Sequence, residues 1–160
     1  MSSFTGRGQL LVSLPMLLPI APALDFFDCG FRPDLGVLVG RWLRPISTEE
    51  SKQGYAHFLV VARQHGCRLW LMDVRRRPRM DNATLTWLFS DYFPAAARDL
   101  GGPIYLSTLL APGLLQELVG HVALPSADAG PAQPCHLGRF ITEHEALAWL
   151  YQRPAATPGG

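Results

Sequence analysis

After residue 22, runs of apolar residues and turn residues alternate in a way that predicts two strands. Ala23–Cys29 and Leu35–Arg44 are rich in aromatic and aliphatic side chains, as strands are. Gly30–Asp34, which lies between them, contains a glycine, a proline and an aspartate and has the chemistry of a turn. Two strands this close in sequence are expected to pair as an antiparallel hairpin.

The next segment has the period of an amphipathic helix. Ser47 followed by Glu50 three residues later is a capping-box sequence, and Gly66 is the residue type that ends a helix in the left-handed conformation. Four apolar residues recur on one face between these limits: Tyr55, Phe58, Leu59 and Ala62. Cys67–Val74 follows as a continuous apolar run, which predicts a strand covered on both faces.

A second helix is expected after residue 80, with one interruption. Asp81 or Asn82 can cap its start, and Gly101 and Gly102 can end it. Pro94 has no backbone N–H to donate, so it should kink or restart the helix. The apolar stripe of this helix consists of Leu85, Leu88, Phe89 and Tyr92.

The last third of the chain is less regular. Pro103–Thr108 predicts a strand, and Pro112 is placed to open a short helix that carries Leu114, Leu115 and Leu118. Gly120–Gly138 contains three prolines and no helical stripe, so it is interpreted as a long loop with room for a short strand at His121–Leu124.

Arg139–Gln152 predicts a final short strand and a helix capped by Thr142. The resulting element order is β-β-α-β-α-β-α-β-α. Alternating strands and helices predict an α/β fold with a single, mostly parallel sheet. An antiparallel N-terminal hairpin would form its edge, and about four helices would flank it.

A length of 160 residues suits one domain. We expect an N-terminal arm over residues 1–22, an α/β domain over 23–152 and a disordered tail over 153–160. The arm carries an apolar run that resembles a signal peptide, but Pro15 and Pro19 would break the helix that such a peptide adopts. The run is also too short to span a bilayer, so no membrane span is predicted.

Charge and cysteine content narrow the expected environment. With 14 basic and 13 acidic residues the net charge is +1, so any electrostatic signal must be local and nucleic acid is disfavoured as a partner. Cys29, Cys67 and Cys135 are far apart and contain no C-x-x-C pair. Such a set favours reduced thiols, and hence a cytoplasmic location, over a disulfide framework.

Four segments, in their order along the chain, resemble the bacterial STAS/SpoIIAA-like family, which is related to anti-sigma-factor antagonists. They are "VGRWLRPISTEE", "LWLMDVRRR", "WLFSDYFPAAARDLG" and "RFITEHEALAWL", and the likeness extends over Ala23–Tyr151. It implies a non-enzymatic module that docks on partner proteins. In the antagonist branch a phosphorylatable serine follows the central strand. Asp73 fits the aspartate at the end of that strand, but the loop holds no serine and Thr84 is the nearest hydroxyl, so we expect no such switch.

The loop after that strand is the main candidate site. Four arginines, Arg75, Arg76, Arg77 and Arg79, follow Asp73 within six positions. They can form internal ion pairs with Asp73 and Asp81 that make the loop rigid. Alternatively, together with Asp73, they bind an anion or an acidic partner, because arginine offers paired donors to carboxylate and phosphate.

Trp87 is the second candidate contact. It falls beside the apolar stripe of its helix, so together with Tyr92 and Phe93 it could form an exposed apolar patch for a partner. No catalytic motif is recognisable, and the histidines lack metal-ligand spacing. Cys135 and His136 are adjacent in the presumed loop, where a solvated pair is favoured over a metal site. No enzymatic activity, cofactor or metal is therefore predicted.

These observations favour a regulatory or scaffolding module that docks on another protein, with acidic partners suggested by the arginines, or on a second copy of itself. The alternative is a protein that binds a lipid-like or anionic small ligand in a cleft between helices and sheet.

Overall fold

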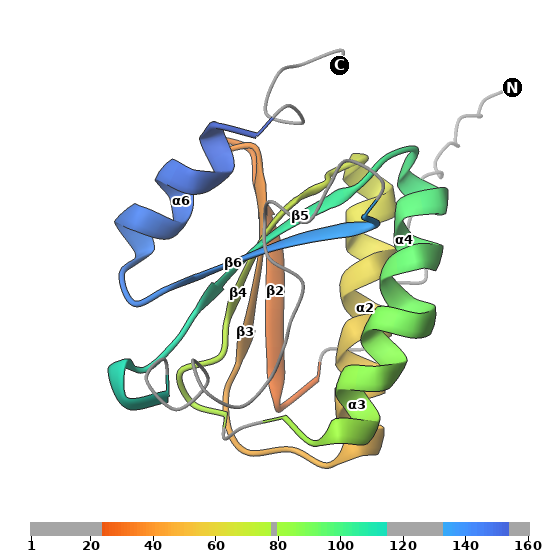
Figure 1. Ribbon diagram of the computed structural model, residues 1–160, viewed down its shortest axis with the longest axis vertical. Coiled ribbons are helices and arrows are strands. Elements are labelled where there is room, and N and C mark those ends of the chain that lie inside the picture. The colour runs from red at the N-terminus through yellow and green to blue at the C-terminus, as the bar shows by residue number, and fades with distance from the viewer. Residues whose placement is uncertain (1–23, 78–79, 115–132, 154–160) are drawn as a thin grey trace, which may run out of the picture.

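Five strands form one sheet in the order β2-β3-β4-β5-β6 in the computed structural model, which describes residues 24–77, 80–114 and 133–153 (Figure 1). β2 and β3 pair antiparallel, and every later pair is parallel. The α/β fold with an antiparallel hairpin at one edge of a parallel sheet, flanked by helices, is therefore confirmed. The strands are β2 (Phe27–Arg32), β3 (Val37–Trp42), β4 (Leu69–Asp73), β5 (Ile104–Leu109) and β6 (Cys135–Phe140).

The helices cover the two faces of the sheet unequally. The element α2 (Thr48–His65) and the continuous group α3 (Asn82–Trp87), η1 (Leu88–Tyr92) and α4 (Phe93–Leu100) lie on one face (Figure 1). α6 (Glu143–Tyr151) lies on the opposite face, where it packs on β5, β6 and β4. Because β3, β4 and β5 are consecutive neighbours, right-handed crossovers of the same sense bring α2 and α4 to the same side.

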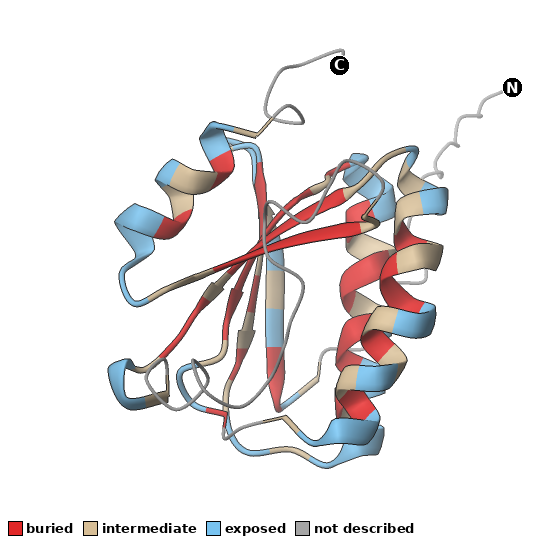
Figure 2. Ribbon diagram, viewed as in Figure 1, coloured by how far each residue is buried: buried red, intermediate tan, exposed pale blue. Residues whose placement is uncertain are grey.

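The core lies mainly between the sheet and α2 with α4, as the buried residues in Figure 2 show. Trp42, Trp70 and Phe58 are fully buried there, and the rings of Phe58 and Trp70 meet edge to face with centroids 4.9 Å apart. β4 is buried along its whole length, as its continuous apolar sequence predicts. The four predicted stripe residues of α2 are all buried.

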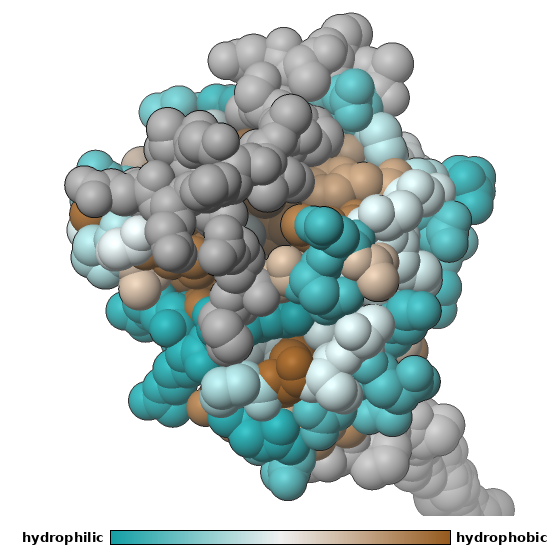
Figure 3. Space-filling model, turned by 60° about the horizontal axis from the view of Figure 1, so that its bottom comes forward, coloured by the Kyte–Doolittle hydropathy of each residue, from teal (hydrophilic) through white to brown (hydrophobic). Residues whose placement is uncertain are grey.

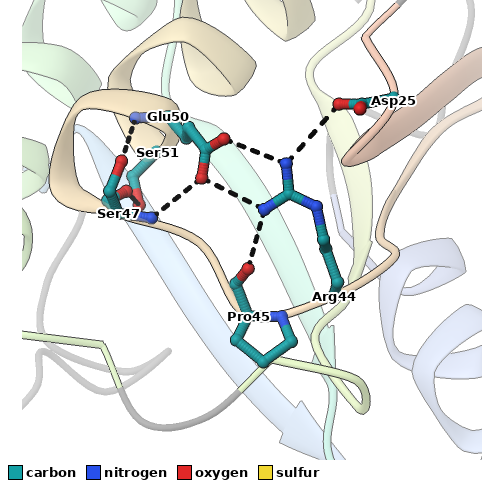
Figure 4. A network of polar contacts seen from close by, with 6 residues as sticks. All are labelled: Asp25, Arg44, Pro45, Ser47, Glu50 and Ser51. Atoms are coloured by element: carbon teal, nitrogen blue, oxygen red, sulfur yellow. Dashed lines mark hydrogen bonds and ion pairs between the residues drawn. The ribbon is translucent and has the colours of Figure 1, made fainter.

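The start of α2 is fixed by a polar network (Figure 4). The Ser47 hydroxyl accepts from the Glu50 backbone N–H, and the Glu50 carboxylate accepts from the Ser47 N–H, so the predicted capping box is present. Arg44 donates to both carboxylate oxygens of Glu50 at 3.2 and 3.0 Å and also lies 3.5 Å from Asp25. Gly66 ends the helix with φ 57°, as expected.

The second helical segment is continuous but changes its hydrogen-bond pattern just before Pro94. Asp81 caps α3 through the Thr84 N–H, and the helix then widens into the π-helical turn η1. Phe93 donates its N–H to the Leu88 carbonyl, five residues back, immediately before the proline restarts the helix as α4. The wider turn lets the chain pass a residue that cannot donate a hydrogen bond.

Two predicted boundaries are wrong. β2 continues through Gly30 to Arg32, so the turn of the hairpin comes later, where the N–H groups of Leu35 and Gly36 donate to the Arg32 carbonyl. Pairing with β3 extends the strand through residues whose local chemistry suits a turn.

β6 begins at Cys135, within the segment interpreted as a loop. Cys135 and His136 are consequently buried strand residues, not a solvated pair, and the imidazole stacks on Tyr105. The three cysteines are free thiols. The arm over 1–22, the strand at His121–Leu124 and residues 154–160 of the tail lie outside the described residues.

Candidate binding site at the carboxyl ends of the strands

The predicted loop leaves the carboxyl end of β4, next to the entrance of α2. The parallel register places Arg41, near the end of β3, beside Asp73, at the end of β4. The starts of α2 and α3 lie at the same end of the molecule, which Figure 1 shows at the bottom. Open α/β sheets place their ligand sites at the carboxyl ends of their strands. Figure 3 brings this end forward, and hydrophilic residues there surround small apolar areas.

Asp73 organises the first part of the loop. Its side chain is only 6% exposed, and its carboxylate accepts hydrogen bonds from the Arg75 backbone N–H, the Arg75 side chain and Arg41. Burial alone would raise the pKa of this carboxyl, but the hydrogen bonds from Arg75 and Arg41 outweigh burial and lower it. Asp73 is therefore ionised at neutral pH and holds the strand exit in place.

Arg41 is a site residue that the sequence reasoning missed. Its Nε donates to Asp73 at 3.1 Å from the neighbouring strand. The observed parallel register of β3 and β4 places the two residues side by side, although they are 32 positions apart in sequence. No local signal identifies Arg41, because its contact with Asp73 depends on the register between two strands that are distant in sequence.

Arg77 turns to the opposite face of the sheet. It is buried, its guanidinium carbon lies 4.8 Å from the centre of the Trp42 ring, and one terminal nitrogen donates to the Ser51 hydroxyl at 2.7 Å. The other terminal nitrogen, Nη1, is buried without a hydrogen-bond partner. Burial lowers the pKa of the Arg77 guanidinium, and no described carboxylate forms an ion pair with it.

The remaining charged residues of the loop differ in their exposure and contacts. Arg76 is exposed and forms no ion pair within the described part of the chain. Arg79 lies outside the described residues. Asp81 accepts from the Thr84 N–H and hydroxyl at 3.1 and 2.6 Å, so it caps α3, and it forms no ion pair with an arginine of the described residues. The expectation of internal pairs is therefore confirmed for Asp73, which binds Arg75. Asp81 forms no ion pair with Arg75, Arg76 or Arg77, and a pair with Arg79 lies outside the described residues.

Trp87 is partly exposed, as the helical pattern suggested, and Lys52 lies 5.5 Å from its ring centre. The predicted patch around it is wrong, because Tyr92 and Phe93 belong to the core with exposures of 5% and 1%. The Tyr92 hydroxyl donates to the Tyr55 carbonyl at 2.6 Å, which holds the ring inside. The burial of Tyr92 agrees with the apolar stripe expected for this helix, whereas Phe93, which follows the π-helical turn, was not on that stripe and is buried as well.

A cleft of about 270 Å³ opens on the other face, between β2, β3 and the start of α6. Val39, Leu71 and Leu147 give it an apolar floor. Its charged lining comprises Asp28, Arg32, Arg41 and Glu143. Arg41 thus connects this cleft to the Asp73 cluster.

Comparison of the sequence with protein-family models and with curated proteins found no match. Among residues 24–77, 80–114 and 133–153, no group of histidine, cysteine and acidic side chains is arranged to hold a metal ion. No helix in these same ranges combines the length and the apolar character needed to cross a bilayer.

Proposed function

We propose that the protein is a non-enzymatic regulatory or scaffolding module, and that its β4–α3 loop docks on an acidic segment of a partner protein. The observation that carries this proposal is an excess of positively charged side chains at the carboxyl end of β4. Arg76 is exposed and Arg77 is buried, and neither has a carboxylate partner among the described residues. A partner carboxylate would pair with Arg76, which is exposed and has no ion pair among the described residues.

The loop is also anchored at both ends, which favours binding. Asp73 fixes its start through the Arg75 N–H, and the Arg77 N–H closes a turn on the Val74 carbonyl at 3.2 Å. Asp81 fixes its end as the cap of α3. The described residues at the two ends of the loop are held by these hydrogen bonds, so they lose little conformational freedom on binding and more of the interaction energy appears as affinity. The resemblance to STAS/SpoIIAA-like domains supports a docking role. We also propose a cytoplasmic location.

The test must separate recognition from stability. Neutralising the whole arginine run would not do so, because Arg75 and Arg77 have internal contacts. Arg76→Glu changes the exposed arginine that makes no ion pair among the described residues, and Arg98→Glu, at an exposed position on α4, is the matched control for charge. Binding of a fluorescent glutamate-rich peptide is measured by anisotropy, together with recovery of partners from a lysate of the native host.

Arg76→Glu should weaken peptide binding by about tenfold or more, because a charge-assisted contact becomes a repulsion. The melting temperature should stay within about 1 °C of wild type, since exposed charges contribute little to stability. Arg98→Glu should leave peptide binding unchanged. Equal affinity of wild type and Arg76→Glu for the peptide and for recovered partners would contradict the proposal.

One observation favours a second candidate function, the binding of a small ligand. The cleft beside α6 combines an apolar floor with Arg41, whose Nε alone is engaged by Asp73. A medium-chain carboxylate would match that lining. Calorimetric titration with decanoate tests the idea, and heat signals that persist unchanged in Arg41→Ala would exclude binding at this cleft.

A further inference from the structure

The outer edge of β2 has no partner strand within the described part of the chain, and the backbone groups that it presents can be assigned. The Phe26 carbonyl accepts from the Leu43 N–H, and the Arg32 carbonyl closes the hairpin turn. Even-numbered residues of β2 therefore direct their hydrogen bonds toward β3. Because the direction alternates along an antiparallel strand, Phe27, Cys29 and Phe31 present N–H and C=O groups to the free edge.

The side chains along this edge form a symmetric charge pattern. Asp28 and Arg32 lie two residues before and two residues after Gly30, on the same face of the sheet, and all three are exposed. Asp28 makes no ion pair with any described residue. A strand with an acid and a base equally spaced about one residue is complementary to an antiparallel copy of itself.

We propose that a second copy of the chain pairs with β2 to form a dimer with a twofold axis at Gly30. In this register Asp28 of each copy faces Arg32 of the other, so two ion pairs form. If the second strand is shifted by two residues in either direction, Asp28 lies opposite Gly30 or opposite Asp34, and both ion pairs are lost. The charge pattern therefore selects one register.

The backbone agrees with this register. Cys29 and Phe31 would exchange hydrogen bonds across the axis, while Gly30 and the two charged pairs would occupy the non-hydrogen-bonded positions. Side chains approach most closely at those positions, which suits ion pairs between strands.

Gly30 itself supports an approaching strand. Gly40 in β3 is required by its surroundings, because a Cβ there would lie 2.8 Å from the Phe58 ring. A Cβ on Gly30 would meet nothing within 4 Å, and its φ is not positive, so no described contact within the domain requires a glycine. Glycine inside a strand commonly marks a place where another backbone or a ligand approaches.

The present partner of Arg32 does not prevent this pairing. Arg32 binds Asp34 through two hydrogen bonds, but the two side chains are 54% and 60% exposed. An exposed pair of this kind is weak and easily rearranged. In the dimer the guanidinium lies between Asp34 of its own chain and Asp28 of the second copy, at the rim of the cleft beside α6.

Charge reversal tests the register in the full-length protein, with mass measured by sedimentation equilibrium at several protein concentrations. Arg32→Asp and Asp28→Arg each turn two attractive pairs into repulsive ones and should raise the dimer dissociation constant by about tenfold or more. The double variant Asp28→Arg with Arg32→Asp exchanges the charges and should restore the wild-type constant. Arg98→Asp is the control for altered net charge.

A cross-linking measurement tests the same register independently of the charge variants, and it remains usable if one of them folds poorly. Gly30→Cys, made with Cys29→Ser, places the two new thiols opposite each other at the axis, where mild oxidation should give a covalent dimer. The wild-type protein should give none, because Cys29 faces Phe31 in this register. A monomeric wild type at every concentration would overturn the proposal. So would a dimer that survives Arg32→Asp, a double variant that fails to recover, or a Gly30→Cys protein that does not cross-link.

Discussion

Arg75 and Arg77 are two positions apart, yet their environments differ in almost every respect. Arg75 is half exposed and shares Asp73 with Arg41. Arg77 is buried, lies on the Trp42 ring and has no carboxylate partner among the described residues. The strand exit sends them to opposite faces of the sheet. Ion pairing therefore holds one half of the loop, and packing on an aromatic ring holds the other.

The largest expected effect comes from removing the ring beneath Arg77. Trp42 is fully buried, and its ring also contacts Phe27 and Tyr55. Trp42→Ala should lower the free energy of unfolding by about 3–5 kcal/mol, as truncation of a large core aromatic does. Urea denaturation measures this change. A loss below about 1 kcal/mol would show that the ring is not the support of this half of the loop.

An intermediate effect is expected at the ion-paired half. Asp73→Asn replaces a carboxylate that accepts from two arginines and should cost about 2 kcal/mol at pH 7. The folded-state pKa of Asp73 is lowered, so its contribution is present above about pH 4, the ordinary range of an aspartate, and is lost as the pH falls through the folded-state value.

Wild type and Asp73→Asn should therefore converge in stability in acid, which urea denaturation at a series of pH values measures. Asp34→Asn, at an exposed pair, is the control and should leave stability nearly unchanged at every pH. A constant difference between wild type and Asp73→Asn down to pH 2 would show that the charge of Asp73 is not what stabilises the exit.

The smallest effect is expected for a change that removes only the buried charge. Arg77→Met keeps a long side chain on Trp42 and removes a cation that burial disfavours, so the free energy of unfolding should change by less than about 1 kcal/mol. Arg77→Ala also loses the packing and should cost about 2 kcal/mol. If both variants lose the same stability, the charge and its bond to Ser51 matter more than the packing.

The sequence predicts the elements of the fold well because their signals are local. Ser47 with Glu50, Gly66 and Pro94 act through the backbone of their own segments, and the structure confirms each one. The turn placed at Gly30–Asp34 was wrong because pairing with β3 decides where β2 ends.

The candidate site is less predictable from the sequence. The loop, the pair of Asp73 with Arg75 and the cap at Asp81 follow from residues close in sequence. The burial of Arg77 depends on Trp42 and Ser51, more than 20 positions away, and the contribution of Arg41 depends on strand register. No local pattern distinguishes Arg77 from Arg76.

The position of Arg76 has an evolutionary consequence. It is an exposed residue between two neighbours that carry the internal contacts of the loop. Substitutions there are nearly neutral for folding, since surface changes away from such contacts typically shift stability by under about 0.5 kcal/mol. Related chains can therefore diverge at this one position, and acquire different binding preferences, while the scaffold beneath it stays the same.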